Sequence, residues 1–256
     1  MNSKSAFSLV ELAVVLVILG LLTGGILAGR SLIRASELRA VSTELAKHKA
    51  TLYAFKGKYF ALPGDMPNAT AFWGAADGND GLAGDCDAAT ITGTLTCNGD
   101  ANGRIEHTRD SNYAWQHIAN AGLVEGVFGR SGSPYVVGTT VPASKLPRTG
   151  YLIIDRNQQW YGKRGPEGNF IRVSKPSNNA NALAGGVVSA EEAWNIDTKM
   201  DDGTADGGAL YVMRGYPETS SSLPASGCVS GARTDTAITF TLDDTEKNCG
   251  LMYWVD

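Results

Sequence analysis

One carboxylate, Glu11, stands at the front edge of a long apolar segment and is the most unusual chemical group in the sequence. An ionisable side chain at membrane depth is functional by default and needs a partner. No basic residue lies one helical turn away, so the partner would come from the backbone, from water or from another chain. The alternative is structural, because the helix dipole stabilises a carboxylate on the first turn. The residues alone leave both interpretations open.

A loop at residues 98–105 gathers oxygens in a pattern suited to calcium, which takes six to eight hard oxygen ligands. It matches the first half of an EF-hand loop, with oxygens from Asn98, Asp100 and Asn102 at positions one, three and five. Position twelve is Arg109 in place of the bidentate glutamate, so a neighbouring carboxylate would have to complete the shell. The pattern makes this loop a candidate calcium site.

A second loop places four carboxylates within ten residues, at the predicted end of a helix. They are Asp197, Asp201, Asp202 and Asp206. Clustered carboxylates repel one another unless a cation neutralises them, so calcium is the candidate cofactor here too. A third acidic segment, residues 77–81, is a weaker candidate. The alternative for all three is structural, because Asp, Asn and Gly are also the residues that make turns.

Four cysteines, Cys86, Cys97, Cys228 and Cys249, allow three pairings. Proximity in sequence favours Cys86–Cys97 and Cys228–Cys249. Free buried thiols are the alternative, but Cys86 and Cys97 sit among Asp, Thr and Asn, which is a poor core environment. In an oxidising compartment such as the periplasm we expect disulfides.

Composition disfavours an enzyme and a nucleic-acid-binding protein. The chain has 256 residues, 31 of them glycine and three of them histidine, and its net charge of −4 supplies no electrostatic footprint for nucleic acid. No G-x-S-x-G, H-E-x-x-H or P-loop motif is present. His107 and His117 are interpreted as surface or half-buried side chains and not as a catalytic base. The sequence therefore predicts no enzyme and no nucleic-acid partner.

The apolar segment is long enough to cross a membrane. Residues 12–29 carry no charge, and about 17–25 residues span a bilayer as a helix. A cleaved signal peptide is the weaker interpretation, since its apolar core is usually about 7–15 residues long. Lys4 precedes the segment while Arg30 and Arg34 follow it, so the positive-inside rule does not orient it.

Residues Ala6–Phe7–Ser8–Leu9–Val10–Glu11, behind a short leader containing a lysine, resemble the processing site of type IV prepilins and type II secretion pseudopilins. In that family a membrane aspartyl peptidase cuts just before the Phe and methylates the new N-terminus. The resemblance makes Ala6–Phe7 the scissile bond, Phe7 the methylated residue and Glu11 the partner of a neighbouring subunit's N-terminal amine. The chain departs from the family at Ala6, where Gly is usual, and in having no proline in the apolar helix.

The resemblance implies a structural subunit of a helical filament, either a type IV pilus or a type II secretion filament. The large body favours a minor pilin or pseudopilin over a major pilin. The implied partners are neighbouring subunits, the prepilin peptidase, the inner-membrane assembly machinery and membrane lipid. The implied location is the inner membrane, with a cytoplasmic leader and a periplasmic body, and then a cell-surface or periplasm-spanning filament. Cys228–Cys249 also resembles the C-terminal disulfide loop of many type IV pilins.

Two other interpretations stay open. The chain could be a membrane-anchored periplasmic binding protein or hydrolase that never enters a filament, or a body carried on a pilus to bind a substrate or receptor. Four tryptophans could line such a binding site, although core packing is the more common role of this residue. They are Trp73, Trp115, Trp160 and Trp194.

The helical pattern continues beyond the membrane segment to Phe55. Apolar residues recur there on one stripe with a period of 3.6 residues. The stripe consists of Leu38, Val41, Leu45, Leu52 and Phe55. We therefore expect a leader at residues 1–6, an N-terminal transmembrane and assembly helix at 7–55, and a globular body at 56–256.

The order of predicted elements indicates an α+β body. Together with the resemblance, this predicts a pilin-like fold, in which the long helix packs on a loop-rich antiparallel sheet. A helix is expected over Asn112–Ala121, and a capping box at Ser189–Glu192 opens another towards Met200. β-branched and aromatic residues between turns predict five strands. These are Tyr151–Asp155, Gln159–Gly162, Asn169–Val173, Leu210–Arg214 and Ala237–Leu242.

Overall fold

The computed structural model describes residues 8–76, 93–106, 110–129, 135–156, 167–176, 183–215, 227–230 and 238–256. The chain divides into two compact units, Met1–Arg39 and Ala40–Asp256, with the boundary inside the first helix. The described strands all lie in the second unit. The α+β, pilin-like architecture predicted from the sequence is confirmed.

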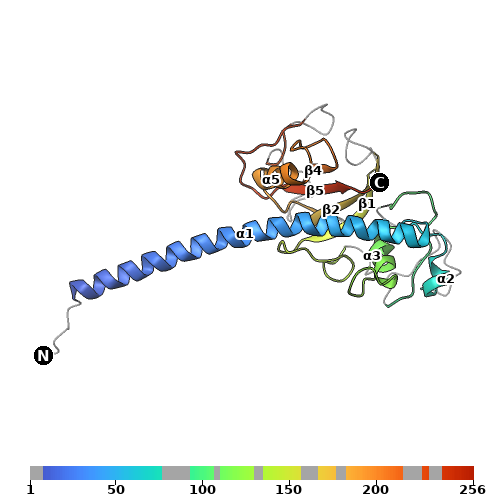
Figure 1. Cartoon of the computed structure of the whole chain (residues 1–256), viewed down its shortest axis with the longest axis horizontal. Coiled ribbons are helices and arrows are strands. Elements are labelled where there is room, and N and C mark those ends of the chain that lie inside the picture. The colour runs from blue at the N-terminus through green and yellow to red at the C-terminus, as the bar shows by residue number, and fades with distance from the viewer. Residues whose placement is uncertain are drawn as a thin grey trace. The chain divides into compact units, whose positions relative to one another are not determined.

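Helix α1 runs over Leu9–Tyr59 (Figure 1). It is uninterrupted because the sequence has no proline before Pro63, and it ends at Tyr59, just before Phe60, whose φ of +54° is left-handed. The helix contains an 18-residue window of mean hydropathy 2.5, of which 0% is buried inside the structure. By length and composition α1 can cross a membrane, as predicted.

The C-terminal part of α1 belongs to the second unit and buries one stripe of side chains there. Val41, Leu45, Leu52 and Phe55 are buried, as the periodicity predicts. His48 lies on the same stripe and is also buried, although it is polar. Its ring packs against Trp115 and Tyr151, with centroid separations of 4.8 and 4.6 Å.

The second unit is built on one antiparallel sheet with the order β1–β2–β5–β4, and β3 pairs with β2 off this path. The strands are β1 Gly150–Arg156, β2 Gly168–Pro176, β3 Leu183–Gly185, β4 Leu210–Arg214 and β5 Cys249–Trp254. In the centre of the sheet, Ile171 of β2 pairs with Ile153 of β1 and with Tyr253 of β5. Leu152, Ile153 and Ile154 are buried in succession, so both faces of β1 are covered.

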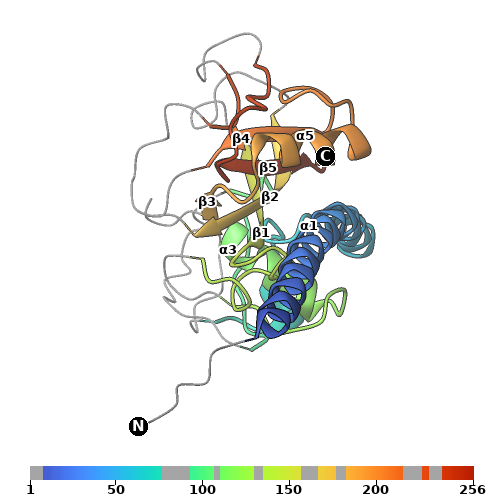
Figure 2. The same cartoon turned by 90° about the vertical axis from the view of Figure 1, so that its left-hand side faces the viewer.

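Helices cover this sheet at two places. In α3, Ser111–Asn120, the buried Trp115 donates its indole N–H to the carbonyl oxygen of Tyr151 at 2.6 Å. Figure 1 shows α3 beside the C-terminal part of α1. Helix α5, Ala190–Met200, contacts β4 and β5 (Figure 2).

Most predicted elements of the body are present. The α3 helix and strands β1, β2 and β4 lie where the sequence places them, and the capping box of Ser189 and Glu192 opens α5. The strand predicted at 237–242 is wrong for its described residues, where only Phe240 makes an isolated bridge, to Val229. The strand predicted at 159–162 lies outside the described residues.

Three elements within the described residues were not predicted. They are the short helix α2, Ala69–Trp73, and the strands β3 and β5. Of these, β5 is the most important for the fold, because it lies inside the sheet between β2 and β4.

Candidate functional site

The N-terminal end of α1 holds the predicted assembly carboxylate. The Glu11 Oε2 atom accepts a hydrogen bond from the backbone N–H of Ser8 at 2.9 Å. The Ser8 hydroxyl in turn accepts the N–H of Val10 at 3.3 Å. Glu11 therefore helps to cap its own helix, and among the described residues no cation pairs with it. Ala6 and Phe7, the predicted cleavage and methylation site, lie outside the described residues.

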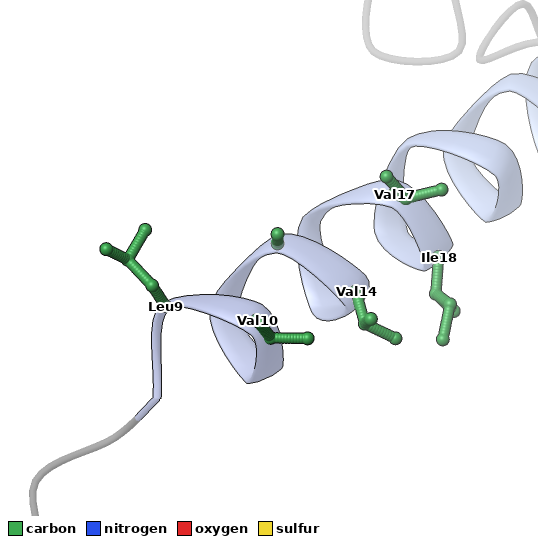
Figure 3. A pocket seen from close by; sticks show the side chains of 6 residues that line it. Leu9, Val10, Val14, Val17 and Ile18 are labelled. Carbon is green, nitrogen blue, oxygen red and sulfur yellow. The ribbon is translucent and has the colours of Figure 1, made fainter.

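The apolar side chains that follow Glu11 are uncovered within the first unit. Leu9, Val10, Val14, Val17 and Ile18 point outward from the helix and line a shallow apolar surface together with Ala13 (Figure 3). Further along, Leu21 is 73% exposed and Leu27 is 67% exposed. Large apolar surfaces of this kind mark contacts with membrane or with other proteins.

The glycines of this segment have no packing partner within the described chain. A Cβ added at Gly20, Gly24, Gly25 or Gly29 would meet no atom within 4 Å outside the helix's own backbone. Each glycine weakens an isolated helix by about 1 kcal/mol relative to alanine. Packing inside the described chain does not account for these glycines.

The disulfide Cys228–Cys249 is confirmed. It fastens the first residue of β5 to the segment 227–230, and the Cys228 and Cys249 side chains are both fully buried. Cys97 is also disulfide-bonded and buried. Its predicted partner, Cys86, lies outside the described residues.

In the first acidic loop, side-chain oxygens accept hydrogen bonds from other groups of the protein. Asn98 Oδ1 accepts the backbone N–H of Thr70 at 2.9 Å, while the Asn102 amide donates to Asp100 Oδ2 at 3.1 Å. The loop folds around a buried carboxylate from another segment, Asp65, which was not predicted from the sequence. Its two carboxylate oxygens accept the backbone N–H groups of Asn102 and Gly103, at 3.1 and 2.8 Å.

Asp65 nevertheless belongs to a carboxylate group. One oxygen each of Asp65, Asp100 and Asp110 lie within 4.8 Å of one another. Burial, more than the neighbouring Asp100, raises the pKa of Asp65 to about 6, against the opposing effect of its backbone hydrogen bonds. The one sequence signal for a role of Asp65 was its position inside the turn-forming stretch Leu62–Met66.

The second acidic loop follows α5. One oxygen each of Asp197, Asp201 and Asp202 lie within 4.8 Å of one another. The fourth predicted ligand, Asp206, is outside this group, and its Oδ2 accepts the backbone N–H of Ile238 at 3.3 Å. The structure thus brings three of the four predicted carboxylates together.

The two described histidines, His48 and His117, are buried in the second unit. His117 is fully buried, which corrects its interpretation as a surface or half-buried residue. Its Nδ1 accepts the N–H of Gly64 at 2.9 Å and its Nε2 lies 2.9 Å from the Thr96 hydroxyl. Burial lowers the pKa of His117 to about 3, so the ring is neutral at pH 7. His107 lies outside the described residues.

A polar network between the half-buried Glu44 of α1 and the buried Tyr151 of β1 was also not predicted from the sequence. The Tyr151 hydroxyl donates to Glu44 Oε2 and lies 3.1 Å from the Ser144 hydroxyl. Burial, helped by the Glu44 charge, raises the pKa of Tyr151 above its usual range. This network joins α1 to β1 within the second unit.

The predicted tryptophan site is not assembled among the described residues. Trp115 is buried in the core, and Trp73 packs against Phe55 and His117. Trp194 is 38% exposed on α5. Trp160 lies outside the described residues.

Comparison with known proteins points to the N-terminal segment. Residues 1–27 match the family model described as the prokaryotic N-terminal methylation motif. No curated protein and no solved structure matches the chain. The chain therefore carries a type IV prepilin-like signal, as predicted, and the match includes Ala6, Phe7 and Glu11.

Proposed function

We propose that this chain is the precursor of a minor pilin or pseudopilin, a structural subunit of a type IV pilus or a type II secretion filament. The observation that carries the proposal is the methylation motif at residues 1–27, placed on a helix whose apolar side chains are exposed. Proteins with this motif have structural roles. Prepilin peptidase cuts the chain between Ala6 and Phe7 and methylates Phe7.

The exposed apolar surface of α1 supports membrane anchoring first and assembly afterwards. Lipid covers the side chains from Leu9 to Ile33 before assembly, with the body in the periplasm, and the helices of neighbouring subunits cover them in the filament. Removing apolar surface from water contributes about 25 cal/mol per Å². The inner-membrane assembly machinery moves the subunit from the first environment to the second.

Glu11 gives this assembly its register. A carboxylate buried in a filament core is costly unless it is paired. Within the described chain it accepts one hydrogen bond, from Ser8, and pairs with no cation. The amine released at Phe7 of a neighbouring subunit is the cation that the proposal supplies.

Mass spectrometry of the N-terminus, on protein isolated from its native membrane, tests this function. The proposal predicts a chain that begins at N-methylated Phe7. An intact Met1 would instead favour a membrane-anchored periplasmic binding protein or hydrolase. A terminus near Arg30 would indicate a secreted protein, and either result would overturn the proposal.

A further inference from the structure

The last turn of α5 and the loop after it bring three carboxylates together without a cation. One oxygen each of Asp197, Asp201 and Asp202 lie within 4.8 Å of one another. Among the described residues no lysine or arginine forms an ion pair with any of them. Like charges at this distance repel one another, so the arrangement needs a proton or a cation.

The buried member of this group has an oxygen that nothing satisfies. Asp197 is 0% exposed, and its Oδ1 accepts the backbone N–H of Gly203 at 3.3 Å. Its Oδ2 is buried and has no hydrogen-bond partner among the described residues. Leaving a buried acceptor unsatisfied destabilises the fold, and more so when the group is charged. Asp197 therefore keeps one buried carboxylate oxygen without a hydrogen-bond partner in the described part of the chain.

The other acidic group of the body lacks this feature. Both oxygens of Asp65 accept backbone N–H groups, from Asn102 and Gly103. These N–H groups stabilise the Asp65 carboxylate, so it does not need a cation. The two groups have the same composition, three aspartates each, but only the one at Asp197 keeps a buried oxygen without a partner.

The remaining two carboxylates are fixed in place and partly open to solvent. Asp201 Oδ2 accepts the backbone N–H of Leu210, the first residue of β4, at 2.9 Å, and also that of Ala209. Asp202 is exposed, and its Oδ1 accepts the Thr204 N–H at 2.8 Å. An ion could thus reach the group from solvent without displacing the core.

We propose that Asp197, Asp201 and Asp202 bind one calcium ion, which fastens the end of α5 to the start of β4. Three carboxylates are hard oxygen ligands, and calcium tolerates a flexible shell completed by backbone carbonyls and water. Zinc is disfavoured because the group offers no nitrogen or sulfur. The site lies wholly in the second unit, so this proposal is independent of filament assembly.

Protonation of Asp197 is the competing way to satisfy the group. Burial, together with the charges of Asp202 and Asp201, raises the pKa of Asp197 to about 7. Measurements at pH 8 keep this carboxyl mostly ionised and so favour the ion over the proton.

The test is calcium binding by the full chain in detergent at pH 8, measured by titration calorimetry and thermal unfolding. We expect one calcium per chain and a melting temperature that rises by about 5–10 °C at a calcium concentration roughly 100 times Kd, relative to EGTA. Magnesium at the same concentration should raise it less, because magnesium demands a stricter octahedral shell.

Variants separate calcium binding from a general loss of stability. Asp197→Asn should abolish the calcium-dependent rise while unfolding in EGTA no earlier than the wild type, because it removes a buried charge. Asp202→Asn, an exposed position, should weaken calcium binding about tenfold or more. Asp243→Asn is the matched control, an exposed aspartate outside the group, and should retain the wild-type response. No calorimetric binding by the wild type, or an unchanged rise in Asp197→Asn, would overturn the proposal.

Discussion

The two parts of α1 differ in what covers their apolar side chains. In the first unit Leu9 is 85% exposed and Leu21 is 73% exposed, whereas Leu45 and Phe55 in the second unit are 0% exposed. Residues 12–29 of the first part carry no charge on any side, whereas the second part is apolar along one stripe that its own body covers. A helix of the first kind needs an apolar medium or other helices around it. The comparison teaches that one continuous helix can have its apolar side chains covered by its own chain over one part and left exposed over the other.

The largest effect should come from Glu11, the carboxylate at the start of the uncovered part. We expect Glu11→Gln to leave membrane insertion intact but to reduce incorporation into filaments by about 100-fold or more. Leaving one member of a buried charge pair without its partner costs about 3–5 kcal/mol, and each 1.4 kcal/mol is a factor of ten. Quantitative immunoblotting of sheared filaments against membranes measures this ratio.

The control for Glu11 is another glutamate of the same unit. Glu37→Gln removes a carboxylate that forms a 3.1 Å ion pair with Arg34 on its own helix, so assembly should be close to wild type. Equal losses in the two variants would mean that charge alone matters, and would contradict a specific role for Glu11.

The next effect concerns the covered part. Phe55→Ala should lower the free energy of unfolding of the second unit by about 3–5 kcal/mol, because it leaves a cavity in a packed core. Phe55 contacts Tyr59, Trp73 and His117 there. Denaturant unfolding in detergent, followed by tryptophan fluorescence, measures the change.

Ile18→Ala is the matched substitution in the uncovered part. Ile18 is 50% exposed, so its truncation should leave unfolding of the second unit unchanged within about 0.5 kcal/mol. A large loss of stability in Ile18→Ala would show that the body covers this side chain after all, and the comparison would fail.

A smaller effect is expected from pH, through the buried histidine of the covered part. Burial and the charge of Lys47 lower the pKa of His48 to about 4, while the unfolded chain keeps the ordinary value of 6.5. The unfolded state therefore binds a proton first as pH falls from 6.5 to 4, and this destabilises the fold. At pH 5 the loss should be about 2 kcal/mol, since one pKa unit corresponds to about 1.36 kcal/mol.

The comparison with His48→Met isolates this contribution. The raised pKa values of Asp65 and Asp197 act with the opposite sign, favouring the fold on acidification, but they do so in both proteins. The difference in unfolding free energy between the two proteins should therefore change by about 2 kcal/mol between pH 7 and pH 5. A difference that is independent of pH would contradict the assignment of a neutral buried ring.

The smallest effect on the body should come from a glycine of the uncovered part. Gly24→Ala adds a methyl group that meets no described atom within 4 Å outside the helix's own backbone, so unfolding of the second unit should not change by more than about 0.5 kcal/mol. Scanning calorimetry in detergent checks this. If the variant shifts the unfolding of the body, Gly24 packs against it, and the account of the first unit is wrong.

Local signals explain which parts of the fold could be predicted. The absence of proline and the 3.6-residue period predict α1, and the Ser189–Glu192 capping box predicts α5 because both hydrogen bonds lie within one turn. Strand β5 could not be predicted in this way. Its place between β2 and β4 depends on pairing with residues far away in sequence, and such pairing outweighs local propensity.

The same limit applies to the acidic loops. The sequence predicts both as calcium candidates, the first from its partial EF-hand spacing and the second from its four clustered carboxylates. It cannot show that Asn98 is bound to Thr70, or that Asp65, far from the loop in sequence, accepts its backbone N–H groups. Nor can it show that Asp197 Oδ2 is left without a donor. The two loops therefore differ in that both Asp65 oxygens accept backbone N–H groups, whereas Asp197 Oδ2 accepts none from the described residues.

Site-specific photocrosslinking at Val17 and Leu45 tests the central comparison most directly. A photoreactive amino acid at Val17, in cells that assemble filaments, should give adducts that mass spectrometry identifies as neighbouring subunits, and these adducts should disappear in Glu11→Gln. The same probe at Leu45, which is 0% exposed, should give none. Crosslinks to lipid alone at Val17 under assembling conditions, or equal subunit adducts at both positions, would contradict the account.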